Sequence, residues 1–75
     1  MKKISVIIAG RHQTSITLEE EFYEAFKKIA QKEQKSLSGL ITEIDRTREQ
    51  ENLSSAIRVY ILKYLQNELT KRSSE

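Results

Sequence analysis

The 75-residue chain contains no cysteine, no proline and no tryptophan, and it has one histidine and two glycines. The absence of cysteine excludes disulfides and fits a reducing compartment, so we expect a cytoplasmic protein. One histidine excludes a metal site built from several histidines of one chain, and we expect no cofactor. A domain this small often needs help to be stable. Because disulfides and such a metal site are excluded, the composition favours an oligomer.

The sequence also argues against an enzyme. The single histidine, His12, has no evident serine and aspartate partners, and we expect it on the surface or in a turn. Two isolated glycines cannot form a glycine-rich phosphate loop. The acidic residues of Glu19–Glu24 are typical of a helix start rather than of a catalytic carboxylate pair. No apolar run is long enough to span a membrane, and Ile4–Ala9 is too short for a good signal-peptide core.

Charge is segregated along the chain although the net charge is only +2, from 13 lysines and arginines and 11 acidic residues. The first twelve residues carry three cations and no acid. An acidic cluster follows in Glu19–Glu24, and lysines dominate the stretch after it, residues 27–35. One face of the folded protein could therefore be basic in spite of the small net charge.

Two short strands are predicted near the N-terminus. Ile4–Ala9 is rich in β-branched residues, and Gly10 after it permits a bend or turn. In Gln13–Leu18 polar and apolar residues alternate, which predicts a strand with Ile16 and Leu18 on its buried face. The two segments could form a hairpin or one strand broken at the glycine, and the pattern does not decide between them.

A first helix is predicted over residues 19–32. Its apolar residues follow the spacing of a single stripe, namely Phe22, Ala25, Phe26, Ile29 and Ala30. Thr17 and Glu20 have the spacing of a capping box, and the acids of the first turn suit the helix dipole.

A second helix is predicted to open at Ser36, its expected N-cap, with Ser38 as the competing choice. Residues 45–51 are either the exposed end of this helix or a loop. Asn52 or Ser54 is the expected cap of a third helix that runs to about Leu69. This helix is apolar most of the way round, so one side can face its own chain and the other needs a partner. We therefore expect a single domain over residues 1–70, followed by a polar tail over residues 71–75.

The segment TSITLEEEFYEAFKKIAQKEQKSLSGLITEI, residues 14–44, resembles the ribbon-helix-helix family of DNA-binding proteins, to which the Met and Arc repressors belong. The glycine-led strand before it and the Asn-Leu-Ser-Ser-Ala helix after it resemble a variant of that family with an additional C-terminal helix. The resemblance implies a mainly α fold with a short β-ribbon. It also implies an intertwined homodimer, whose intermolecular antiparallel strands enter the DNA major groove.

The resemblance also implies roles for individual residues. The base-contacting positions are Gln13, Ser15, Thr17 and Arg11. The positions that contact DNA phosphates at the start of the second helix are Ser36, Leu37, Ser38 and Lys35, because free N–H groups there can hold an anion. The implied dimer core consists of Ile16, Leu18, Phe22, Phe26, Ile41, Ile57 and Ile61. From the strand pattern alone, a merely solvated polar face is the alternative for Gln13, Ser15 and Thr17.

The resemblance therefore predicts sequence-specific binding of double-stranded DNA by a homodimer, in a small transcriptional repressor or an antitoxin-like regulator. The alternative is a protein–protein interaction module that keeps the fold and binds little DNA. The broadly apolar third helix favours this alternative, because it could bind a second protein. Neither of these two functions requires binding to a membrane.

Overall fold

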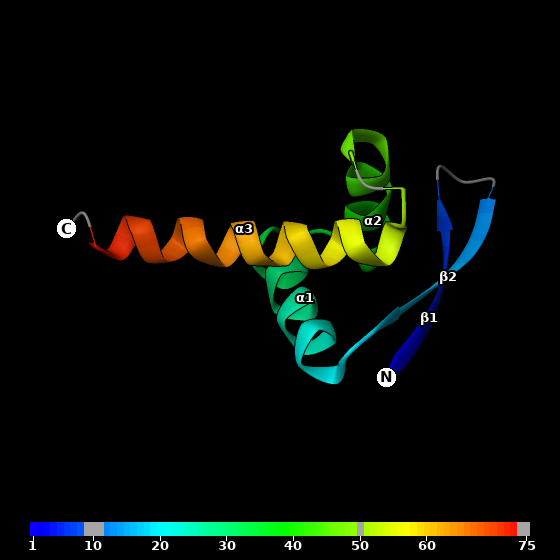
Figure 1. Ribbon diagram of the computed structural model, residues 1–75, viewed down its shortest axis with the longest axis horizontal. Coiled ribbons are helices and arrows are strands. Elements are labelled where there is room, and N and C mark those ends of the chain that lie inside the picture. The colour runs from blue at the N-terminus through cyan, green and yellow to red at the C-terminus, as the bar shows by residue number, and fades with distance from the viewer. Residues whose placement is uncertain (9–11, 50, 74–75) are drawn as a thin grey trace.

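The computed structural model shows a two-stranded hairpin followed by three helices (Figure 1). The structure describes residues 1–8, 12–49 and 51–73. The elements in chain order are β1 (Lys2–Ile8), β2 (His12–Leu18), α1 (Glu20–Lys32), α2 (Leu37–Thr47) and α3 (Leu53–Ser73). This mainly helical fold with a short β-ribbon is the one that the sequence predicts.

The two strands form an antiparallel hairpin, which settles the alternative that the sequence leaves open. Ile4 lies opposite Ile16, and Val6 lies opposite Thr14. Alternation along each strand places apolar side chains on one side of the ribbon, where Val6 and Ile16 are buried. The predicted bend at Gly10 lies outside the described residues.

The hydrogen-bonding partner of β2 is thus a strand of the same chain. The other edge of β2 meets the start of α3, where the N–H of Thr17 donates to Ser54 Oγ at 3.3 Å. Pairing between strands of two chains, which the resemblance implies, stays a prediction. Such pairing at that edge of β2 would have to displace this contact.

Helix α1 begins at Glu20, and Glu19 is its N-cap. The Glu19 side chain makes no capping hydrogen bond. The capping box predicted from Thr17 and Glu20 is wrong, because Thr17 is still part of β2 and its side chain is exposed. The charge pattern of the first turn, with Glu20 and Glu21, agrees with the helix dipole.

The chain leaves α1 through a left-handed residue that the sequence does not predict. Gln34 has a φ of 57°, a left-handed conformation that glycine usually occupies after a helix. The Gln34 N–H donates to the Gln31 carbonyl at 3.1 Å, and the Lys35 N–H donates to the Ala30 carbonyl at 2.9 Å. This pair of bonds is the Schellman arrangement, and it turns the chain toward α2.

Helix α2 starts as predicted, because Ser36 is its N-cap and the Ser36 Oγ accepts from the Gly39 N–H at 3.0 Å. The helix continues to Thr47, so the first part of the charged segment is helical. Asp45 and Arg48 form an ion pair of 3.1 Å at this end of the helix.

Helix α3 begins after Asn52, whose Oδ1 accepts from the Ser55 N–H at 3.1 Å. The expected end near Leu69 is wrong, since the helix continues to Ser73. No glycine or proline interrupts this stretch, and its lysine, glutamine and leucine residues favour helix. Residues 71–73 of the predicted tail are therefore helical.

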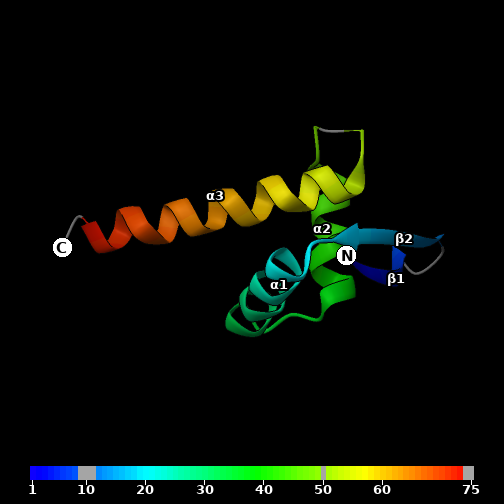
Figure 2. The same ribbon diagram turned by 60° about the horizontal axis from the view of Figure 1, so that its bottom comes forward.

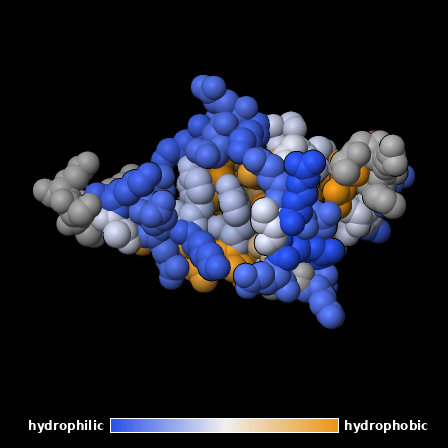
Figure 3. Space-filling model, turned by 90° about the horizontal axis from the view of Figure 1, so that it is seen from above, coloured by the Kyte–Doolittle hydropathy of each residue, from blue (hydrophilic) through white to orange (hydrophobic). Residues whose placement is uncertain are grey.

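The core lies between the inner side of the hairpin and the three helices (Figure 2). β1 packs against α2, and β2 packs against α1 and α3. Of the seven residues predicted as a dimer core, six are buried within this one chain, namely Ile16, Leu18, Phe26, Ile41, Ile57 and Ile61, and Phe22 is partly buried. Their place in a dimer interface stays a prediction. Seen from the α2 side, the surface is mostly hydrophilic, with small apolar areas (Figure 3).

Candidate nucleic-acid interface

The outward face of the hairpin carries side chains from both strands, and all of them are exposed. They are Lys3, Ser5 and Ile7 on β1 and Gln13, Ser15 and Thr17 on β2. The register places Lys3 opposite Thr17, Ser5 opposite Ser15 and Ile7 opposite Gln13. The structure therefore brings together the three base-contacting residues that the sequence predicts on β2.

Sequence reasoning missed the β1 half of this surface. In the structure, exposed and buried positions alternate along β1. Residues 6–8 are all apolar, so the sequence carries no alternation there that would have marked Ile7 as outward-facing. The hairpin register adds the cation of Lys3 to a face that is otherwise uncharged among its described residues. The side chains offer an amide, hydroxyls, an ammonium group and one apolar surface, and no carboxylate.

The Asn-Leu-Ser-Ser-Ala motif at the start of α3 holds the ribbon in place. Besides the Ser54 bond to Thr17, Arg58 Nε donates to Glu19 Oε1 at 2.9 Å. A hydrogen bond to the backbone and the Arg58 side chain beside it lower the pKa of the Glu19 carboxyl below its ordinary value. The junction of β2 and α1 is thus tied to α3 by hydrogen bonds on both sides.

The start of α2 offers free backbone donors. The Ser36 hydroxyl is occupied by Gly39, whereas the N–H groups of Leu37 and Ser38 have no hydrogen-bond acceptor among the described residues. The Leu37 side chain packs against the core, so only its backbone could contact an anion.

The remaining residue of this predicted phosphate site, Lys35, is paired with another side chain. Its Nζ contacts the Glu43 carboxylate at 2.8 Å and 3.0 Å. The hydrogen bond that the Lys35 ammonium group donates to Glu43 raises the pKa of Lys35. A phosphate at this position would compete with Glu43 for the ammonium group.

Two residues of the sequence prediction cannot be placed on this surface. Arg11 lies outside the described residues, and so does the side chain of His12. The expected base contact of Arg11 and the expected surface position of His12 stay predictions.

Neither a metal site nor a membrane span is apparent in the described residues. No group of three or more histidine, cysteine, aspartate or glutamate side chains is arranged there to hold a metal ion. None of the helices within the described ranges is both long enough and apolar enough to cross a membrane.

Comparison with known proteins identifies the domain. A family model described as a ribbon-helix-helix domain matches residues 1–65, from the N-terminus through the first half of α3. No curated protein and no solved structure matches the chain. Ribbon-helix-helix domains are typically DNA-binding regulators rather than enzymes, and they generally bind DNA as dimers. Because the match covers most of the chain and both strands of the ribbon, this protein belongs to the ribbon-helix-helix family.

Proposed function

We propose that this protein binds double-stranded DNA in a sequence-specific manner and acts as a small transcriptional repressor or antitoxin-like regulator. The observation that carries the proposal is the exposed polar face of the two-stranded ribbon, opposite the core. The major groove of DNA admits a two-stranded β-ribbon, and each base pair presents a distinct pattern of donors and acceptors there. The protein would act by occupying an operator, without chemistry.

The side chains on the ribbon match this task. Gln13 can donate and accept in a bidentate contact with adenine, and Ser15 and Thr17 can bond to several bases. Ile7, which is 56% exposed beside Gln13, offers an apolar contact of the kind that thymine methyl groups accept. Lys3 at the end of the ribbon could contact a phosphate or a guanine.

The start of α2 supplies a contact that positions the ribbon without reading sequence. The free N–H groups of Leu37 and Ser38 point out of a helix N-terminus, where the helix dipole favours an anion. A DNA phosphate bound there could replace the Glu43 carboxylate as the partner of the Lys35 ammonium group. We propose that the protein makes these contacts as a homodimer, as its family generally does.

The decisive experiment removes the polar ribbon side chains without disturbing the fold. Because they are exposed, the variant Gln13→Ala/Ser15→Ala/Thr17→Ala should keep the circular dichroism spectrum of the wild type. Duplexes selected from a random pool by the wild type are then compared with unselected duplexes by fluorescence anisotropy. Each good base contact is worth about 1–3 kcal/mol of discrimination, so the variant should lose most of the sequence preference.

A matched control places the same kind of change on α3, as Gln66→Ala/Asn67→Ala/Thr70→Ala, where all three residues are exposed. This control should select and bind like the wild type. Binding by the wild type should also weaken steeply as salt rises, because phosphate contacts release counterions. Absence of binding to any duplex at low salt, or an unchanged preference in the ribbon variant, would refute the proposal. The second outcome, with biological activity intact, would favour the interaction-module alternative.

A further inference from the structure

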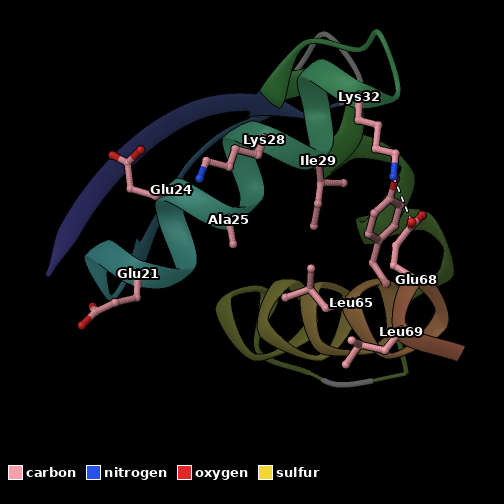
Figure 4. Close-up of a pocket in the computed structure, with 10 residues that line it drawn as sticks. Glu21, Glu24, Ala25, Lys28, Ile29, Lys32, Leu65, Glu68 and Leu69 are labelled. Atoms are coloured by element: carbon pink, nitrogen blue, oxygen red, sulfur yellow. Dashed lines mark ion pairs between the residues drawn. The ribbon is translucent and has the colours of Figure 1, made fainter. Parts of the chain in front are cut away.

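The apolar groove between α1 and the C-terminal half of α3 follows from the length of α3. Leu65 and Leu69 line this groove and are 44% and 62% exposed (Figure 4). At intervals of four residues they continue the stripe of Ile57 and Ile61, which are buried in the core. The C-terminal half of α3 extends away from the hairpin (Figure 1), so the end of its apolar stripe is left in water.

Ile7 is exposed for a different reason, because it lies on the outward face of the hairpin. Its side chain is 56% exposed, whereas those of its neighbours Val6 and Ile8 are buried. Among the described residues of the two strands, it is the only large apolar side chain that is exposed. A single exposed apolar residue is common on protein surfaces, so exposure alone assigns no role to Ile7. The register of the hairpin supplies the second observation.

The register gives Ile7 a specific neighbour on the outward face. Gln13 lies directly opposite it on β2, and both side chains are exposed. The Cβ atoms of directly opposite residues in such a ladder are about 4.5–5.5 Å apart. The next pair along this face is Ser5 and Ser15. Because serine side chains are shorter, those of Ile7 and Gln13 can extend beyond them toward a ligand.

The major-groove edge of an A·T base pair offers a partner to each of these two side chains. Adenine presents its N7 acceptor and N6 donor, which match the amide of Gln13, and thymine presents its C5 methyl group. Successive base pairs are about 3.4 Å apart along the duplex. Two side chains about 4.5–5.5 Å apart can therefore reach one base pair or two neighbouring ones.

We propose that Ile7 and Gln13 together read one A·T base pair or two adjacent ones, with Gln13 on an adenine and Ile7 against a thymine methyl group. This inference rests on the proposed function and adds Ile7, from β1, as a specificity-determining residue. Both side chains belong to the same hairpin, so their contact does not require strands of two chains to pair.

Uracil in place of thymine tests the role of Ile7, because it removes only the C5 methyl group from the DNA. Each thymine of a duplex selected by the wild type is replaced singly, and affinity is measured by fluorescence anisotropy. Burial of one carbon group changes affinity by a factor of about four, so replacement of the thymine read by Ile7 should weaken binding by about that factor. Ile7→Ser should bind the thymine and uracil duplexes equally, and Ile7→Val should keep part of the difference.

Two matched variants control for general effects on the ribbon and on the protein. Thr17→Ser removes a methyl group from another exposed position of the ribbon. Leu62→Ser removes an apolar side chain that is 54% exposed on α3. Both controls should keep the difference between thymine and uracil at the position that Ile7 reads. A purely structural role of Ile7 would not make the response to uracil depend on its side chain.

The adenine contact is located in the same duplex with 7-deazaadenine, in which a carbon atom replaces N7. The replacement that weakens binding by the wild type but not by Gln13→Ala marks the adenine that Gln13 reads. The register predicts that this adenine lies in the base pair of the thymine read by Ile7, or in a neighbouring pair. A separation of more than about two base pairs would overturn the proposal.

Two other outcomes would overturn this inference and leave the proposed function intact. One is sequence-specific binding by the wild type that no uracil replacement weakens. The other is an Ile7→Ser variant that keeps the wild-type difference between thymine and uracil. The uracil and 7-deazaadenine scans of the wild type remain decisive even if Ile7→Ser disturbs the hairpin. If the wild type binds no duplex at low salt, the proposed function fails and this inference fails with it.

Discussion

Replacement of Ile57 tests whether α3 is an integral part of the fold. Its side chain is 0% exposed, in a helix that a minimal ribbon-helix-helix domain does not require. Ile57→Ala removes three carbon groups, and burial is worth about 0.8 kcal/mol for each. The cavity left behind adds to that loss, so the free energy of unfolding should fall by about 2–4 kcal/mol. Ile57→Val removes a single methylene and should cost about 1 kcal/mol.

Urea unfolding followed by circular dichroism measures these costs. Leu62→Ala is the control on the same helix, because Leu62 is 54% exposed and its truncation should change stability by no more than about 0.5 kcal/mol. A 75-residue domain has a small free energy of unfolding. If Ile57→Ala unfolds the protein, the milder variant Ile57→Val still gives a measurable difference. If Ile57→Ala costs as little as Leu62→Ala, α3 is not packed into the core and the reasoning is refuted.

Two further predictions concern the ends of α1. Gln34→Gly should stabilise the protein by about 1 kcal/mol, because glycine adopts the left-handed conformation of this position without a steric penalty. The control Gln31→Gly lies inside the helix and should instead destabilise the protein. A loss of stability in Gln34→Gly would contradict the account of the turn. At the start of the helix, the lowered pKa of Glu19 means that its ionised form stabilises the fold. That contribution is present above the ordinary pKa of 4.5 and is lost as pH falls through the lower value of the folded state. Arg58→Gln should therefore move the pKa of Glu19, measured by NMR titration, part of the way back up, and an unchanged titration would show that Arg58 does not act on it.

Local patterns were sufficient for the three helices and for the starts of α2 and α3. The apolar stripe of α1 and the capping side chains of Ser36 and Asn52 are properties of neighbouring residues, and the structure confirms them. The errors arose where a contact with a distant segment or an unfavoured backbone conformation outweighed the local pattern. Thr17 has the spacing of a capping residue, but pairing with Lys3 in the hairpin keeps it in β2. Gln34 follows the C-cap of α1 in a left-handed conformation, although nothing in its residue type favours that conformation.

The candidate site was only half predictable. Alternation along β2 indicated which side chains share a face, since that period belongs to the strand itself. The partner strand could not be predicted, because pairing depends on where β1 lies relative to α2 and on the contact of Ser54 with Thr17. The same limit applies to Lys35, which has the right position for a phosphate contact and is held by Glu43 eight residues away.

The sequence by itself determined the helices, the alternating polar face of β2 and the resemblance that led to the family, because all three depend on the identity and spacing of nearby residues. Only the tertiary structure decided that β1 completes the ribbon within one chain, and that the start of α3 clamps this ribbon to α1. It also decided which part of α3 is buried in the core and which part leaves Leu65 and Leu69 in water. These outcomes depend on contacts between segments that are far apart in the chain, which no local period contains.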